Sequence, residues 1–172
     1  MRMNKLFSLV VLFVLLSNNN FGIFAQGMKI VSPHPDIKFK ITRCGAAGNT
    51  VVIDFIIENI NPIDVDLRLN SGHHRNLAGA RTVAYDDEGN KFTGKRFKVQ
   101  LADSKLIDWG EANEILPSEI PLKGRFQIEG VPESATEFKR IDVDINSDAL
   151  GIPMGTEKRL RITNLPINHE GD

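Results

Sequence analysis

Alternation of apolar and polar side chains is the feature that most constrains this chain, because it gives each segment one apolar and one polar face. In residues 50–59, Val51, Ile53, Phe55 and Ile57 share one face. A period of two residues is typical of a β-strand with one face in a core, whereas an amphipathic helix repeats every 3.6 residues. The opposite face carries Val52 and Ile56 beside Asp54 and Glu58, which makes this strand the least polar in the chain. We therefore expect it to lie centrally in its sheet.

The same pattern predicts about eight strands with turns between them. The segments that show it are 36–44, 50–59, 63–70, 79–85, 91–101, 120–129, 138–145 and 158–165. Glycine, asparagine and proline mark the breaks, and Gly89-Asn90 suits a hairpin turn. Residues 104–116 lack a clear period and are interpreted as a short helix or a loop. Regular turns without a long amphipathic helix favour an antiparallel sandwich or barrel over an α/β fold.

The first 26 residues have the layout of a secretory signal peptide. Arg2 and Lys5 precede an apolar run over residues 6–16, and Ala25 is a small residue at the expected cleavage position. Cleavage there leaves residues 26–172 as a single domain. The run is shorter than the roughly 20 apolar residues that span a bilayer, and no following cysteine offers a lipid-anchor site. We therefore expect a periplasmic or secreted protein with no transmembrane segment after cleavage.

Charge and cysteine content narrow the classes of partner. The leader holds two of the 21 basic residues and no acidic one, so the remainder carries 19 basic against 22 acidic residues, a net charge near −3. This balance gives no reason to expect a nucleic acid or an anionic membrane as the partner. Cys44 is the single cysteine and cannot form an internal disulfide, so we expect it to be a buried core residue.

Oxygen-bearing side chains at every second position make residues 142–148 a candidate metal site. Asp142, Asp144, Asn146 and Asp148 resemble the first half of a calcium-binding loop. The sixth position of that loop is serine instead of glycine, and the twelfth is proline instead of a bidentate glutamate. The alternative is an amphipathic strand whose acidic outer face runs into a turn. Calcium is the one cofactor that the pattern suggests, and otherwise none is expected.

Three further residues are candidates for binding. His73 and His74 carry imidazoles, which are common metal ligands, but neighbouring residues of an extended segment point in opposite directions. An exposed polar loop is the alternative for this pair. Trp109 stands in the segment without a clear period, where it serves either as an exposed anchor for a partner or as a plug at an open end of the sandwich.

Signatures of catalysis are weak in this sequence. It contains no Gly-x-Ser-x-Gly elbow, and the glycines of residues 45–48 lack the lysine and helix of a phosphate-binding loop. A sugar-binding sandwich would display aromatic platforms, whereas this chain has one Trp and one Tyr. We therefore expect a protein that is not an enzyme, with a carbohydrate-binding domain only as the third possibility.

Several turns and strand ends occur together in a recognisable order. They are Cys44-Gly-Ala-Ala-Gly-Asn-Thr50, the strand ending in Glu58-Asn59, Tyr85-Asp-Asp-Glu-Gly-Asn90, Leu116-Pro-Ser-Glu-Ile-Pro-Leu-Lys123, Gly130-Val-Pro132 and Ile162-Thr-Asn-Leu-Pro-Ile167. In this order they resemble small, uncharacterised immunoglobulin-like proteins exported by Gram-negative bacteria. The resemblance covers most of the chain after the leader and implies an immunoglobulin-like antiparallel β-sandwich of about eight strands. It implies no catalytic residue.

These observations favour a non-catalytic binding or accessory module that contacts another envelope or secreted protein through a sheet edge or an end loop. The alternative is a calcium-dependent module or an enzyme that uses the acidic loops. An interaction module should expose an apolar patch or an unprotected edge strand on its folded surface.

Overall fold

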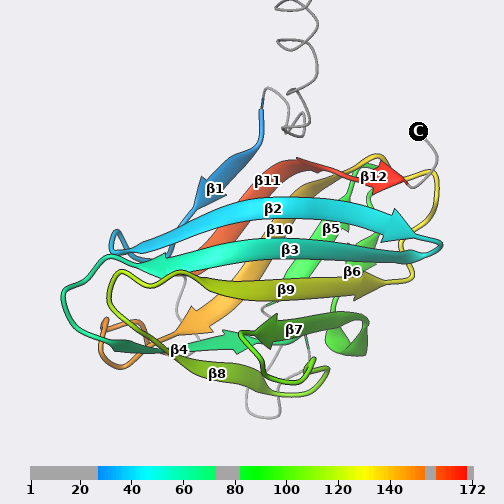
Figure 1. The fold of residues 1–172 in the computed structure, drawn as a ribbon. Helices are drawn as coiled ribbons and strands as arrows, with labels where there is room; N and C mark the ends of the chain where they lie inside the picture. Colours follow the sequence, from blue (N-terminus) through cyan, green and yellow to red (C-terminus); the bar gives the residue numbers. More distant parts are fainter. Residues whose placement is uncertain (1–26, 73–81, 154–157, 170–172) are drawn as a thin grey trace, which may run out of the picture.

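Two facing layers of strands form the protein, as a computed structural model shows for residues 27–72, 82–153 and 158–169 (Figure 1). The strands of these residues are β1 (Lys29–Val31), β2 (Ile37–Ala47), β3 (Thr50–Asn59), β4 (Val65–Asn70), β5 (Val83–Asp86), β6 (Lys91–Phe92), β7 (Phe97–Leu101), β8 (Glu111–Leu116), β9 (Leu122–Glu129), β10 (Glu137–Asn146), β11 (Arg159–Pro166) and β12 (Asn168–His169). A 3-10 helix, η1 (Gly94–Arg96), precedes β7, and the described residues contain no α-helix. The predicted all-β sandwich is confirmed.

The two sheets differ in how regularly their strands are ordered. One sheet has the order β12-β2-β3-β9-β7, with β3 in its centre as predicted. The other has the order β1-β11-β10-β4-β8, and β5 with its partner β6 joins it alongside β10. Neighbouring strands are antiparallel except β12, which runs parallel to β2.

The sequence pattern and the structure differ in several short segments. β8 lies in residues 104–116, where a helix or loop was expected, and β12 follows the last of the predicted strands. The single strand expected over residues 91–101 is divided into β6, η1 and β7. The predicted leader and its expected cleavage site lie outside the described residues. Within the described residues, no helix is long and apolar enough to cross a membrane.

The core lies between the apolar faces of the two sheets. Phe55, Phe97 and Phe126 form an aromatic group within it, with ring centroids 4.5 Å apart for Phe55 and Phe126 and 5.7 Å apart for Phe97 and Phe126. All three are fully buried. The alternating residues of β10, Ile141, Val143 and Ile145 among them, form part of the same core cluster.

β10 changes partner along its length, because β4 and β5 both pair with the same side of it. β5 pairs with residues 138–142 of β10, and β4 pairs with Ile145 and Asn146. Thr82 fills the position between them: its Oγ1 donates to the Asn70 carbonyl oxygen at 2.7 Å and accepts from the Asp144 N–H at 3.0 Å. The Thr82 side chain thus replaces a backbone hydrogen bond between strands at the point where β10 changes its partner from β5 to β4.

β2 lies near one edge of its sheet, and its outer edge is protected against pairing. β12 pairs only with Gly45 and Ala46. Lys38 and Lys40 are exposed, and the register with β3 shifts at Thr42, which produces a bulge. Lysines and bulges are devices that keep a free edge from recruiting another strand. The β2 edge is therefore a poor surface for strand addition.

Cys44 is completely buried, as the sequence predicts, and its thiol should be inert in the native protein. Burial raises the pKa of this thiol to about 12, which leaves almost no reactive thiolate near neutral pH. We expect no labelling of Cys44 by a thiol reagent at pH 8 in the native state, and one thiol per chain after unfolding in urea. Equal labelling rates in the two states would contradict a buried Cys44.

Candidate functional site

The acidic residues singled out in the sequence lie on β10 and on the turn that follows it. Asp142, Asp144 and Asn146 point to the outer face of the strand, while Asp148 lies in the turn. In an extended strand, positions two apart are separated by about 6.8 Å. Calcium takes oxygen ligands at 2.3–2.6 Å, so three consecutive outward positions of one strand do not converge on one ion.

Asp142 is held between two arginines. Its Oδ1 accepts a hydrogen bond from Arg161 Nε at 2.7 Å, and its Oδ2 accepts one from Arg140 Nε at 2.7 Å. Burial by itself would raise the pKa of Asp142, but the two guanidinium groups outweigh it and hold the pKa below its ordinary value. The carboxylate is therefore charged and already compensated.

The other residues of the row face separate environments. Asp144 is fully buried beside Thr82, and the Asn146 Oδ1 accepts a hydrogen bond from Asn70 Nδ2 at 3.0 Å. Asp148 forms an ion pair with Arg68 at 3.0 Å on the surface. Among the described residues, no group of three or more His, Cys, Asp or Glu side chains is placed to hold a metal ion.

Calcium binding by residues 142–148 stays a prediction, and the geometry sets the expected result of its test. Because the Asp142 oxygens are occupied by arginines, we expect millimolar calcium to leave the melting temperature unchanged, with magnesium and a chelator as controls. A ligand of the native state raises the melting temperature by mass action. A rise seen with calcium but not magnesium would show that the row rearranges to bind it.

His73, His74 and Trp109 were the other predicted binding residues. The two histidines lie outside the described residues. Trp109 retains 46 % of its surface exposed, immediately before Gly110, whose carbonyl oxygen accepts the Ser71 N–H at 2.8 Å. Binding by Trp109 or by the histidines stays a prediction.

Four exposed isoleucines lie at one end of the sandwich, a feature that the sequence pattern did not predict. Ile60, Ile63, Ile115 and Ile120, here called the isoleucine end, are 44–60 % exposed. Only Val31 and Trp109 join them among the large hydrophobic residues exposed in the described part of the chain. The β3–β4 and β8–β9 connections lie at the same end (Figure 1).

Hydrogen bonds between the two loops give the isoleucine end a defined shape. The buried Asn59 donates from Nδ2 to the Ile63 carbonyl oxygen at 2.8 Å and to the Leu116 carbonyl oxygen at 3.2 Å. Ser118 Oγ donates to the Asn61 carbonyl oxygen at 2.7 Å. The bonds to the Leu116 and Asn61 carbonyl oxygens join segments nearly sixty positions apart in the sequence, so they fix the two loops that carry the isoleucines relative to each other.

Carboxylates surround this apolar surface. Asp64 and Glu119 are exposed on the same two loops, and Glu58 lies at the end of β3. The Ser118 N–H donates to Asp64 Oδ1 at 2.9 Å, which fixes that carboxylate beside the β8–β9 connection. The isoleucine end therefore combines exposed apolar side chains with carboxylates on the same two loops.

The sequence alternation was wrong at Ile63, which was expected to point inward. β4 begins only at Val65, so Ile63 belongs to the preceding loop and is 60 % exposed. The signal that could have shown this is the proline next to it, Pro62, because proline interrupts strand pairing. Ile120 stands beside Pro121 in the same way.

Comparisons with known proteins return only distant likenesses. Neither a protein-family model nor a curated protein sequence matches this chain. The solved structures with a similar arrangement include a family 123 glycoside hydrolase from Clostridium perfringens, at 11 % identity and a TM-score of 0.39 over 83 % of this chain and 27 % of that one. The chain thus spans about a quarter of that enzyme's length.

Two further solved structures align with similarly low sequence identity and TM-score. The N-terminal domain of PorA aligns at 10 % identity and a TM-score of 0.36, over 76 % of this chain and 85 % of that one. AvmM, which catalyses macrocyclization in alchivemycin A biosynthesis, aligns at 9 % identity and a TM-score of 0.33, over 81 % and 88 %. At such low TM-scores none of these likenesses bears on the function of this chain.

Proposed function

We propose that this protein is an exported, non-catalytic binding module with an immunoglobulin-like sandwich, and that it contacts another envelope or secreted protein through the isoleucine end. The observation that supports this proposal is the exposure of Ile60, Ile63, Ile115 and Ile120 on hydrogen-bonded loops. Apolar side chains gathered on a rigid surface are typical of protein–protein contacts. The protected β2 edge favours this end over strand addition at that edge.

The surroundings of the isoleucines indicate the chemistry of the partner. Association would bury the apolar side chains, while Asp64 and Glu119 would stay at the rim. Rim charges govern partner choice and association rate more than affinity. The partner surface should therefore present an apolar centre with basic side chains around it.

A pull-down with matched variants tests the proposal. The protein is used to capture partners from periplasmic and envelope extract, beside an Ile63→Asp/Ile120→Asp variant and a Trp109→Asp variant. All three should fold alike, because the replaced side chains are 46–60 % exposed. We expect a protein that the wild type and the Trp109 variant retain and the isoleucine variant loses, and that binds again when purified.

Two results would contradict the proposal. Capture of the same proteins by the wild type and the isoleucine variant would show that this end is not the contact. Loss of the captured protein only in the Trp109 variant would move the contact to the opposite end of β8.

A further inference from the structure

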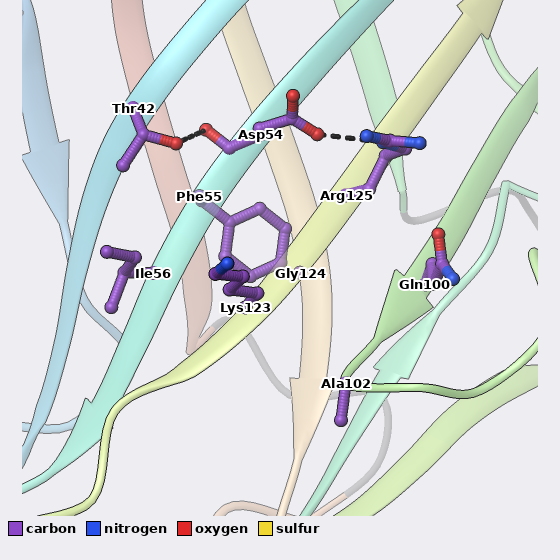
Figure 2. Close-up of a pocket in the computed structure, with 9 residues that line it drawn as sticks. All are labelled: Thr42, Asp54, Phe55, Ile56, Gln100, Ala102, Lys123, Gly124 and Arg125. Atoms are coloured by element: carbon purple, nitrogen blue, oxygen red, sulfur yellow. Dashed lines mark hydrogen bonds and ion pairs between the residues drawn. The ribbon is translucent and has the colours of Figure 1, made fainter.

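A groove crosses the outer face of the β2-β3-β9-β7 sheet and is distinct in its residues from the isoleucine end. It has a volume of about 530 Å³, within the range of small-ligand sites. Its lining consists of Thr42, Asp54, Phe55, Ile56, Gln100, Ala102, Lys123, Gly124 and Arg125, which Figure 2 shows on three neighbouring strands and the end of β7. We call it the sheet groove.

Positive charge exceeds negative charge in and beside the sheet groove. Asp54 accepts a hydrogen bond from Arg125 Nε at 2.7 Å (Figure 2). Arg43 lies 4.0 Å from the other oxygen of the same carboxylate. Lys40 and Lys123 are exposed and form no ion pair with any carboxylate of the described residues. Lys40 and Lys123 therefore add two positive charges beside the Arg125–Asp54 ion pair, in a chain whose net charge is −1.

The register of the sheet sets the spacing of the two unpaired lysines. Lys40 and Lys123 are both direct partners of Ile56, one from each side. Strands lie about 4.8 Å apart, so the two lysine Cα atoms are roughly 10 Å apart, with the half-buried Ile56 between them. The charge is spread across three strands instead of being focused at one point.

We propose that the sheet groove binds an acidic polysaccharide, with Lys40 and Lys123 contacting successive carboxylate or sulfate groups. A single small anion would meet one lysine at a time on this open surface, whereas a chain of anionic sugars meets both. Once one sugar of the chain has bound, the next is held close to the second lysine at a high effective concentration, so the two contacts together bind more tightly than either alone. Thr42 Oγ1 and Gln100 Nε2 donate to backbone carbonyl oxygens, so in this proposal their oxygen atoms accept hydrogen bonds from sugar hydroxyls.

Two other polyanions fit the sheet groove less well. An acidic peptide in extended form binds mainly through its backbone, but the backbone groups on this face are used in the β2–β3 and β3–β9 pairings. A single-stranded nucleic acid needs aromatic platforms for its bases, and the exposed lining of the groove carries none. Phe55 contributes no platform, because its side chain is 1 % exposed. The proposed polysaccharide is held by the two lysines through its charged groups, so it does not depend on stacking against aromatic side chains.

Titration calorimetry with a polygalacturonate oligomer tests the proposal. The protein is compared with a Lys40→Glu/Lys123→Glu variant and with a Lys29→Glu/Lys91→Glu variant. The four lysines are all exposed, so both variants change the net charge equally and should melt alike. We expect the groove variant to bind on the order of tenfold more weakly or not at all, and the control variant to bind like the wild type.

Other outcomes would overturn the proposal. Equal loss in both variants would show attraction to net charge only, and absence of binding by the wild type would remove the site. Equal binding of the methyl-esterified, neutral oligomer would exclude contact with the carboxylates. Tighter binding of a single-stranded oligonucleotide that the groove variant also loses would assign the sheet groove to nucleic acid.

Discussion

Replacing Gly124 by alanine should destabilise the protein by about 3 kcal/mol, which corresponds to a melting temperature lower by about 10 °C. Gly124 of β9 pairs directly with Phe55 of β3, and a Cβ atom at this glycine would lie 2.2 Å from Phe55 Cζ. A close approach of this kind requires the ring to move. Urea unfolding, followed by circular dichroism, measures the change in free energy.

The Phe55 ring has little room to move away. It is 1 % exposed, its centroid lies 4.5 Å from that of Phe126, and it lies 5.7 Å from that of Phe39. Protein cores are close-packed, so a shift of the Phe55 ring would displace the neighbouring rings as well. A Gly124→Ala/Phe55→Leu double variant should therefore lose less stability than the two single changes together, because the smaller side chain vacates the space.

Gly45→Ala provides the matched control for Gly124→Ala. Gly45 is also a strand glycine, and its added Cβ would meet only the end of the exposed Arg43 side chain, at 3.2 Å from Nε. Removing a glycine at a compatible position stabilises proteins by about 0.4–1 kcal/mol through the unfolded state. Similar stabilities for the two alanine variants would show that the Phe55 ring is not confined.

Alternation predicted the strands of this fold well where each strand is long and has one apolar face. The bounds predicted for β3 coincide with those observed, since every second side chain from Val51 to Ile57 enters the core. β8 escaped prediction because its sequence, Glu-Ala-Asn-Glu-Ile-Leu, places polar residues on both faces of an edge strand. β1, β6 and β12 contain only two or three residues, too few to establish a period.

The alternation of apolar and polar residues could not predict which distant segments pair with one another. The division of β10 between β4 and β5 depends on Thr82, which bonds to two strands that are far from it in sequence. The isoleucine end likewise joins the connections that follow β3 and β8, which are brought together by the β4–β8 pairing and by the bonds of Asn59 and Ser118. Alternation reports which side of a strand is apolar, and it does not report which strands meet.

The outer face of β10 shows, at Asp142, that alternation also does not predict which polar side chains are buried. Alternation assigns Asp142 to a solvated face, whereas its side chain is 2 % exposed in the structure. Arg140 of the same strand and Arg161 of β11 lie over it. A strand in the middle of a sheet can bury a charge on its outer face when neighbouring strands supply partners for that charge.

Replacing Asp142 by asparagine should lower the free energy of unfolding at pH 7 by about 2 kcal/mol. The change removes the charge that compensates two arginines and weakens two hydrogen bonds of 2.7 Å. Arg140 and Arg161 are 46 % and 43 % exposed, so water offsets part of the loss and the cost stays below that of a fully buried pair. Urea unfolding at several pH values measures it.

Asp148→Asn is the matched control for Asp142→Asn. It makes the same chemical change six positions along the chain, in an ion pair of 3.0 Å with Arg68. The Asp148 side chain is 77 % exposed, and exposed ion pairs contribute about 0–1 kcal/mol. Equal losses in the two variants would show that the two arginines do not stabilise Asp142 beyond an ordinary surface pair.

The pH dependence separates the charge of Asp142 from its packing. Because its pKa in the folded protein is lower than the ordinary value of 3.8, the unfolded chain binds the proton first as the pH falls. The stabilisation from Asp142 is therefore complete above the ordinary pKa and is lost as the pH falls through the lower, folded pKa. We expect the stability difference between the wild type and Asp142→Asn to be constant from pH 7 to about 5 and to shrink below about 4. A difference that stays the same at pH 3 would mean that the variant loses packing, and that the charge of Asp142 does not contribute.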